Sequence, residues 1–236
     1  MEDLFVLHYQ PILSLEAGKV GHYEALVRLA DEPDGRLIAP ASFLPAAERY
    51  GLIRDIDRMV LDKVATLLGG APGRDGITIA MNVSALTVTD PGMLAHIERG
   101  LTRSGADPAQ LVIELTETAS ISDMKQAKAF CAGVQELGCA IALDDFGAGF
   151  GSFQYLKHLP FRYLKIDGDF IRSLPDSPND QLVVKALVGV VRGMGRSTIA
   201  EFVGDSRTMG LLREYGVDYA QGYEVGRPQA VMPLAA

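Results

Sequence analysis

The chain has 236 residues and a formal net charge of −8 at pH 7. This acidic balance argues against a sequence-independent grip on duplex nucleic acid, which relies on many Lys and Arg side chains that neutralise phosphates. Two cysteines are too few for a disulfide framework or a cysteine-rich zinc site. No apolar run approaches the roughly 18 residues of a membrane span. We expect one domain over residues 1–236, cytoplasmic on its own or within a membrane-attached protein, with no nucleic acid polymer and no direct membrane contact among its partners.

The N-terminal part of the chain predicts an antiparallel hairpin. Apolar runs at Leu4–Leu13 and His22–Leu29 are separated by a short polar segment. This segment is too short for a crossover helix, so the chain should turn back near Gly18.

After this hairpin, apolar residues alternate between helical and strand spacing. Alternating helices and strands of this length are typical of a parallel sheet wrapped in helices. Eight strand candidates, with the first reversed, favour an α/β fold: a modified TIM (β/α)8 barrel with the first strand antiparallel to the rest. Helices are expected at Pro40–Tyr50, Ile53–Leu68, Met93–Ser104, Met124–Leu137, Phe153–Leu159, Gln181–Met194 and Thr208–Tyr215. Strands are expected at Ile77–Val83, Leu111–Leu115, Ala140–Leu143, Tyr163–Ile166, Ser197–Ala200 and Tyr219–Ala220.

Nearly every predicted parallel strand ends in a polar residue that can bind a metal or a phosphate. In a barrel of parallel strands such residues meet at the carboxyl-terminal mouth, where these enzymes keep their sites. A lone acid after a strand is usually a helix cap or a turn former. A whole set at barrel spacing is much harder to attribute to capping. The set consists of Asn82, Glu114, Asp144, Asp145, Lys165, Glu201 and Gln221.

The residue types in this set select the chemistry. Oxygen ligands without His or Cys suit hard divalent cations such as Mg²⁺ and Mn²⁺. Several carboxylates in one mouth would repel each other without cations, and two bridged cations are the usual clamp for displacement at phosphorus. The adjacent Asp144 and Asp145 are a natural bridging element. The glycine-rich loop that follows them does not match the GxGxxG spacing of a dinucleotide fingerprint, so we reject that interpretation.

Short sequence blocks that contain candidate catalytic, metal-binding or ligand-binding residues are distributed over essentially the whole chain. Together they resemble the EAL family of cyclic di-GMP phosphodiesterases, whose name-giving motif stands here as Glu24-Ala25-Leu26. Two residues depart from the family pattern: Gly151 replaces a loop serine, and Gly204 stands where an acid follows the Ala-Glu pair. The blocks are Tyr9-Gln10-Pro11-Ile12, Glu24-Ala25-Leu26 with Arg28, Asn82-Val83-Ser84, Glu114-Leu115-Thr116-Glu117, Asp144-Asp145-Phe146-Gly147, Leu164-Lys165-Ile166-Asp167, Ala200-Glu201 and Gln221-Gly222-Tyr223.

This resemblance implies hydrolysis of cyclic di-GMP to linear pGpG with two divalent cations, Mg²⁺ or Mn²⁺, and inhibition by Ca²⁺. It implies that Glu24, Asn82, Glu114 and Asp144 hold the first metal, and that Asp144, Asp145 and Glu201 hold the second. Glu201, Lys165 and Gln221 would orient the attacking water, and Glu117 would brace the glycine loop. Gln10 and Leu26 would line the nucleotide site, and Arg28 offers a fork of donors for a phosphate or a guanine edge. Asp167 and Phe202 are further candidates for ligand contact, and Phe202 either stacks on a guanine or packs into the barrel rim.

Two other functions compete with this one, and assembly into a homodimer is left open. The first is a sensor module that binds cyclic di-GMP without cutting it, although such modules typically lose metal ligands. The second is a Schiff-base aldolase that uses Lys165 late in a barrel strand. Surrounding carboxylates would keep that lysine protonated, against the depressed pKa that such chemistry needs.

Overall fold

Eight strands close into a barrel in the computed structural model, which describes residues 4–30, 36–70, 76–116, 124–147 and 152–232. Strand β1 pairs antiparallel with both of its neighbours, β2 and β9, and all other neighbours around the barrel are parallel. The predicted fold is therefore confirmed. The barrel strands, in chain order, are β1 (Phe5–Ser14), β2 (Val20–Ala30), β4 (Thr78–Val83), β5 (Leu111–Thr116), β6 (Ala140–Phe146), β7 (Tyr163–Ile166), β8 (Ser197–Ala200) and β9 (Tyr219–Gln221).

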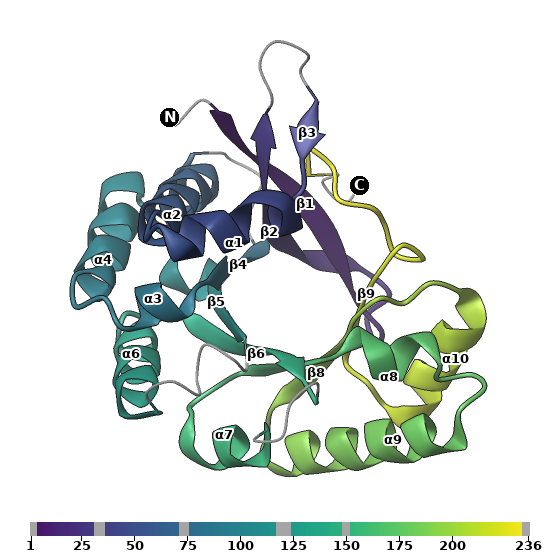
Figure 1. The fold of residues 1–236 in the computed structure, drawn as a ribbon. Coiled ribbons are helices and arrows are strands. Elements are labelled where there is room, and N and C mark those ends of the chain that lie inside the picture. Colours follow the sequence, from purple (N-terminus) through teal and green to yellow (C-terminus); the bar gives the residue numbers. More distant parts are fainter. Residues whose placement is uncertain (1–3, 31–35, 71–75, 117–123, 148–151, 233–236) are drawn as a thin grey trace.

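The helices lie outside the ring of strands (Figure 1). Several of them begin at a capping side chain. The Ser177 side chain accepts a hydrogen bond from the Asp180 backbone N–H and, with Pro178 in the first turn, starts α9 before the predicted residue 181. None of the described helices is long and apolar enough to cross a membrane. The helices are α1 (Pro40–Arg49), α2 (Ile53–Gly69), α3 (Ala85–Val88), α4 (Met93–Ser104), α6 (Met124–Glu136), α7 (Ser152–His158), α8 (Gly168–Arg172), α9 (Pro178–Gly193) and α10 (Ser206–Tyr215), with a 3₁₀ turn at Pro108–Gln110.

Four short elements were not expected from the sequence: α3, α8, the 3₁₀ turn at Pro108–Gln110 and the two-residue edge strand β3 (Leu37–Ile38). Strand β3 exists through its antiparallel pairing with Leu29 and Ala30 of β2. The short helices α3 and α8 begin at capping side chains, those of Ser84 and Asp167. Their few residues carry too little periodicity for sequence analysis to detect.

The barrel has an apolar filling below its mouth. Because side chains alternate along a strand, Ala80 points into the barrel, whereas Ile79 and Met81 belong to the larger core that includes Leu61 and Val64 of α2. On each parallel strand, the residue two positions after the interior residue points to the same side. It therefore lies one layer higher, at the mouth of the barrel. The inner layer is formed by Ile12, Ala80, Val112, Ala142, Tyr163 and Ile199.

Candidate active site

A cluster of carboxylates surrounds one lysine at the carboxyl-terminal mouth of the barrel. The Lys165 side chain on β7 is 1% exposed. Its Nζ lies 2.9 Å from a carboxylate oxygen of each of Glu114, Asp144 and Glu201, and 3.5 Å from Glu24 Oε2. Glu114, Asp144 and Glu24 lie on β5, β6 and β2, and Glu201 directly follows β8, so the barrel brings together side chains that are far apart in the sequence.

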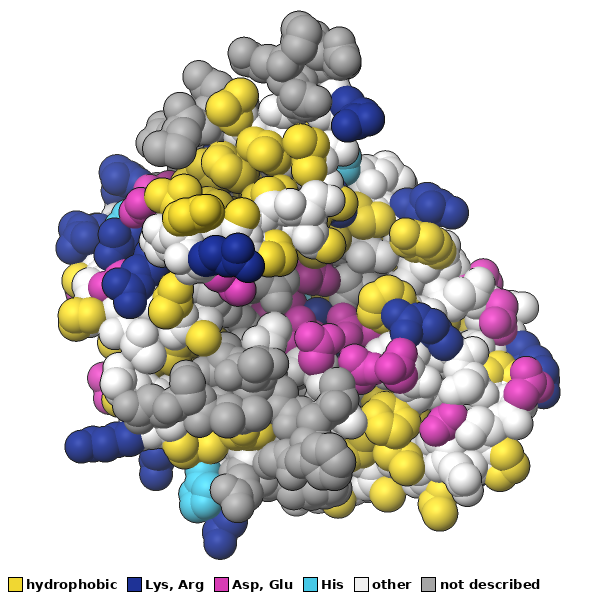
Figure 2. Space-filling model, in the orientation of Figure 1, with side chains coloured by type: hydrophobic (Ala, Val, Ile, Leu, Met, Phe, Trp, Pro, Cys, Tyr) yellow, Lys and Arg dark blue, Asp and Glu magenta, His cyan; other side chains and the backbone are white. Residues whose placement is uncertain are grey.

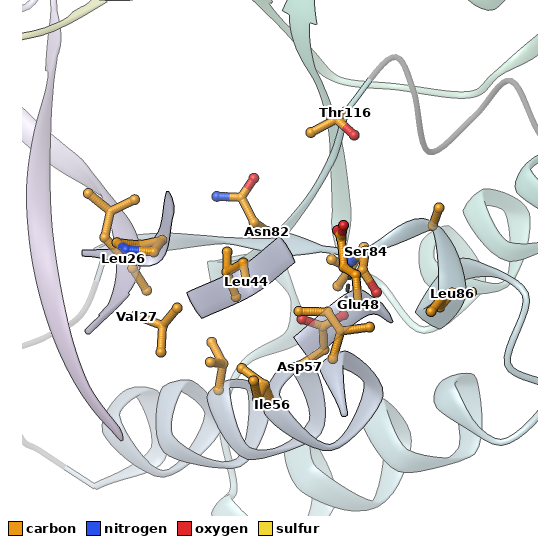
Figure 3. Close-up of a pocket in the computed structure, with 16 residues that line it drawn as sticks. Leu26, Val27, Leu44, Glu48, Ile56, Asp57, Asn82, Ser84, Leu86 and Thr116 are labelled. Atoms are coloured by element: carbon orange, nitrogen blue, oxygen red, sulfur yellow. Dashed lines mark hydrogen bonds between the residues drawn. The ribbon is translucent and has the colours of Figure 1, made fainter. Parts of the chain in front are cut away.

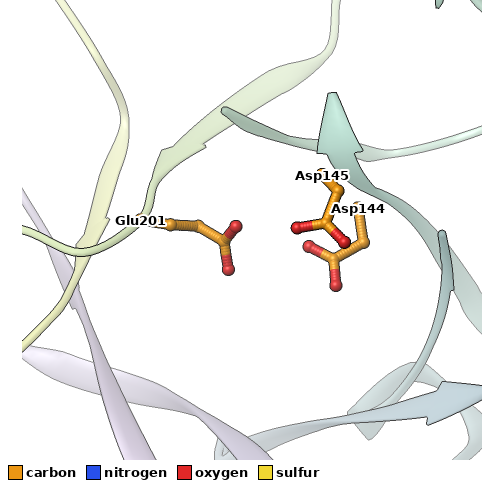
Figure 4. Close-up of side chains that lie close together, drawn as sticks. All are labelled: Asp144, Asp145 and Glu201. Carbon is orange, nitrogen blue, oxygen red and sulfur yellow. The ribbon is translucent and has the colours of Figure 1, made fainter. Parts of the chain in front are cut away.

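Asp144 and Asp145 reach the same site although they are neighbours on one strand. Strand β6 is irregular here: Leu143 pairs with Leu164, but the next paired residue is Phe146, which lies opposite Ile166. Asp145 has a φ of 54°, in the left-handed region that non-glycine residues rarely adopt. Carboxylate oxygens of Asp144, Asp145 and Glu201 lie within 4.8 Å of one another. Figure 4 shows these three side chains pointing toward one another. Neighbouring side chains on a regular strand point to opposite faces, but this bulge directs both carboxylates into the same site.

Glu24 is held by two side-chain amides. Asn82 Nδ2 donates to its Oε1 at 2.7 Å, and Gln221 Nε2 donates to its Oε2 at 2.6 Å. Gln221 also donates to Gln10 Oε1 at 3.2 Å. Burial favours a protonated Glu24, but Lys165 and the hydrogen bonds from Gln221 and Asn82 outweigh it, so its pKa lies below the ordinary value.

The cluster has more negative charge than its single lysine can balance. Burial raises the pKa of Glu114 well above its ordinary value, and Lys165 offsets only part of this effect. Burial also raises the pKa of Glu201 from 4.5 to about 8. Burial and the charge of Asp144 raise the pKa of Asp145 from 3.8 to about 6. The carboxylates in turn outweigh the burial of Lys165 and raise its pKa well above 10.5, which opposes the aldolase alternative.

The donor atoms of this cluster fit divalent cations. Buried Glu114 Oε1 and Gln221 Oε1 have no hydrogen-bond partner among the described residues. An unpartnered carboxylate oxygen in a buried acidic cluster is a position that a cation satisfies. All neighbouring ligand atoms are carboxylate or amide oxygens, the set that Mg²⁺ and Mn²⁺ prefer.

The raised pKa of Glu201 predicts how the stability of the metal-free protein depends on pH. Because this pKa lies at about 8 in the fold and 4.5 in an unfolded chain, the stability that its protonation contributes is complete below 4.5 and lost as the pH rises through about 8. We expect the unfolding free energy in EDTA to fall by on the order of a few kcal/mol between about pH 5 and about pH 9. Urea unfolding of wild type and Glu201→Gln measures it, and the variant should show a flatter profile.

The matched control for this experiment is Glu136→Gln, because Glu136 is an exposed acid on α6. A control profile as flat as that of Glu201→Gln would show that Glu201 is not the group responsible.

Beside the cluster lies a cavity of about 440 Å³. Figure 2 shows acidic side chains gathered in a hollow of the face seen in Figure 1, with basic side chains near its edge. Four of the five residues predicted to contact the ligand line this cavity: Gln10, Leu26, Arg28 and Phe202.

The fifth residue, Asp167, is not among the described lining of the cavity. Its carboxylate accepts a hydrogen bond from the Asp169 backbone N–H at 2.7 Å and caps α8, which is an ordinary role for an acid after a strand. Glu117 and Gly151 lie outside the described residues. Sequence reasoning missed Tyr223 as a lining residue, although an aromatic side chain two residues after the last barrel strand was a visible signal.

A second cavity, of about 420 Å³, lies on the outer side of β2 and β4 against α1, α2 and α3 (Figure 3). It is lined mainly by apolar side chains, and its one buried acid is Asp57. Asp57 Oδ2 accepts hydrogen bonds from the Ser84 backbone N–H and from Thr87 Oγ1, so this carboxylate fastens α2 to the start of α3. Of the metal-binding candidates, Glu24, Asp144, Asp145 and Glu201 line the first cavity, whereas Asn82 lines the second.

The chain resembles proteins of one family over nearly its whole length. The EAL domain model matches residues 2–228. The chain is 38% identical over 237 residues to cyclic di-GMP phosphodiesterase PdeB of Shewanella oneidensis, covering 100% of this chain and 27% of that protein. It is 34% identical over 229 residues to cyclic di-GMP phosphodiesterase PdeF of Escherichia coli, covering 97% of this chain and 30% of that protein. The chain thus spans less than a third of the length of these two relatives.

Solved structures agree with the sequence comparison. The FimX EAL domain from Pseudomonas aeruginosa bound to c-di-GMP superposes with a TM-score of 0.91 at 32% identity, covering 99% of this chain and 94% of that one. The PaMucR phosphodiesterase in its c-di-GMP complex gives a TM-score of 0.88 at 34% identity, covering 96% and 92%. By sequence and by fold, this chain belongs to the EAL domain family.

Proposed function

We propose that this chain is a phosphodiesterase that uses two divalent cations, Mg²⁺ or Mn²⁺, to hydrolyse cyclic di-GMP to linear pGpG. The observation that carries the proposal is the convergence of Glu24, Glu114, Asp144 and Glu201 on one buried lysine, with Asp145 beside them. Relatives named as cyclic di-GMP phosphodiesterases, and similar structures in complex with c-di-GMP, support the choice of substrate.

The proposed metal ligands divide into two groups that share Asp144. Glu24, Asn82, Glu114 and Asp144 would hold the first cation. Asp144, Asp145 and Glu201 would hold the second, and their oxygens are already mutually close. Two bound cations would supply an activated water and neutralise charge that develops at phosphorus.

The remaining residues of the site would orient the reactants. The Lys165 ammonium is positioned among the carboxylates and would stabilise negative charge on the phosphoryl oxygens. Gln221 and Glu201 would hold the attacking water. Gln221 Oε1 is available as an acceptor, because it is buried and has no hydrogen-bond partner among the described residues. Arg28, which lines the cavity, offers a planar fork of donors for a phosphate or a guanine edge.

Glu117 remains a prediction, since its position lies outside the described residues. If it braces the glycine loop, Glu117→Ala should lower kcat and weaken metal dependence only indirectly. A wild-type structure with Glu117 bound directly to metal would contradict this role.

One assay tests the proposed function. The protein is incubated with cyclic di-GMP and Mg²⁺ or Mn²⁺, and the products are separated by chromatography. We expect pGpG to appear with either cation, and Ca²⁺ to suppress it. Tight binding without product would instead identify a sensor module.

A further inference from the structure

The backbone that follows Asp144 on β6 is strained. Asp145 has a φ of 54° and Gly147 a φ of 107°, so two of three successive residues are in the left-handed region. An aspartate keeps this conformation only where its surroundings enforce it. In Figure 4 the Asp145 carboxylate lies beside that of Asp144 and faces Glu201. The contacts that enforce the turn therefore control where this carboxylate lies.

Phe146, in the middle of the turn, is fixed by the neighbouring strand. Its side chain is buried, and it pairs with Ile166 at the end of β7. Its carbonyl oxygen accepts a hydrogen bond from the Asp167 N–H at 3.3 Å. These contacts hold the middle of the turn and leave its Gly147 end to another partner.

That partner is the ring of Phe170 on α8. A Cβ atom added at Gly147 would lie 2.5 Å from Phe170 Cε2 and 3.2 Å from Phe170 Cζ, so the edge of the ring closely approaches the glycine backbone. The left-handed φ and this close approach each favour glycine at the position. The contact joins the end of the β6 turn to a helix that begins only after the next strand.

The helix gives this ring a firm support. The Phe170 N–H donates to Asp167 O at 3.2 Å in the first turn of α8. Ile171 and Leu174, on the same segment, are fully buried in the hydrophobic core. The Phe170 side chain is partly buried and packs against that core as well. The core therefore fixes the ring that bears on Gly147.

We propose that Phe170 is a positioning residue for the second cation. Its ring, packed on Gly147, holds the turn that directs the Asp145 carboxylate to its neighbours in the cluster. The inference rests on the proposed function, because it assumes that this cluster binds a cation. Outer contacts that orient a metal ligand change metal affinity by about 10- to 100-fold when they are lost. Removal of the ring should therefore weaken one cation site, while the ligands on β2, β4 and β5 keep their places.

Titration of the metal-free protein with Mn²⁺ tests this role, with free Mn²⁺ measured by electron paramagnetic resonance. We expect two binding steps in the wild type. Phe170→Ala should raise the Kd of one step by about 10-fold and leave the other within about 3-fold of wild type.

Turnover of cyclic di-GMP gives an independent readout. All carboxylates remain in Phe170→Ala, so the Mn²⁺ concentration for half-maximal turnover should rise by about 10-fold, while kcat at saturating Mn²⁺ stays within about 3-fold of wild type. Asp145→Asn removes a ligand, so excess Mn²⁺ should not rescue it. A purely structural role of the ring would lower stability without this split between metal affinity and kcat.

Phe43→Ala is the matched control. Phe43 is also a partly buried phenylalanine packed against the core, but it lies on α1 beside Phe5. This variant should lose stability and keep wild-type affinity in both Mn²⁺ steps. Phe170→Leu retains an apolar side chain on α8 without the ring edge, so it should show the same selective shift at a smaller cost in stability. It replaces the alanine variant if that variant does not fold.

Gly147→Ala probes the contact from its other side. The added methyl group would meet the Phe170 ring, so it should raise the Kd of the same Mn²⁺ step. In the Phe170→Ala background the obstacle is gone, and the same substitution should have a smaller effect.

Phe170 variants that bind Mn²⁺ in both steps as tightly as Phe43→Ala would overturn the inference, as would full additivity of Gly147→Ala and Phe170→Ala. Hydrolysis of cyclic di-GMP by the wild type would then leave the proposed function standing. Conversely, a wild type that binds Mn²⁺ in two steps but yields no pGpG would contradict the proposed function alone, and a selective loss of one step in Phe170→Ala would still confirm the positioning role.

Discussion

Replacing Asp145 by asparagine is expected to lower kcat for cyclic di-GMP by about 1,000-fold or more, while the protein stays folded and still binds the nucleotide. The substitution removes one negative charge from the Asp144, Asp145 and Glu201 cluster and leaves the side-chain volume unchanged. Asn also tolerates the left-handed backbone conformation that Asp145 adopts, so the bulge in β6 should persist. The measurement is steady-state turnover in Mn²⁺, with circular dichroism and nucleotide binding recorded on the same preparation.

Asp55→Asn, an exposed acid on α2, is the control for Asp145→Asn and should turn over like wild type. Near-wild-type turnover in Asp145→Asn would refute the assignment of this residue to the second cation. Lost turnover together with lost secondary structure would show that Asp145 is needed for folding instead.

Replacing Lys165 by methionine is expected to destabilise the metal-free protein by about 3–5 kcal/mol, because it removes the ammonium that four buried acidic side chains share. Methionine has a similar length and can fill the same space without charge. Mn²⁺ should restore much of the lost stability by supplying the missing positive charge. Turnover should stay low even in Mn²⁺, since the phosphoryl oxygens lose the ammonium.

Urea unfolding in EDTA and in Mn²⁺ measures this effect, with Lys157→Met as the control, because Lys157 is exposed on α7. Equal stability of the two variants in EDTA would mean that Lys165 is not the counter-ion of these acidic side chains.

The sequence alone determined the order of the main helices and strands and the reversed first strand. It also identified most residues of the site, for a simple physical reason. Apolar side chains alternate along each strand, so the polar residue two positions after an interior one, as in Ile199 and Glu201, must lie at the mouth once the barrel forms. The hairpin near Gly18 could also be predicted from the local sequence, because the segment that connects its strands is too short for a crossover helix.

The contacts that only the tertiary structure decided depend on the register between strands that are distant in the sequence. No local pattern indicates that Lys165 lies 2.9 Å from three carboxylates, or that a bulge in β6 makes Asp145 converge with Glu201. The role of Asp167 as the cap of α8 was likewise decided by a turn formed after β7. Phe202 lies against Gly168, which is 34 positions earlier in the chain, and only the parallel pairing of β7 with β8 brings these two residues together. Alternation along a strand is set by the local backbone, whereas these contacts are set by how the barrel closes.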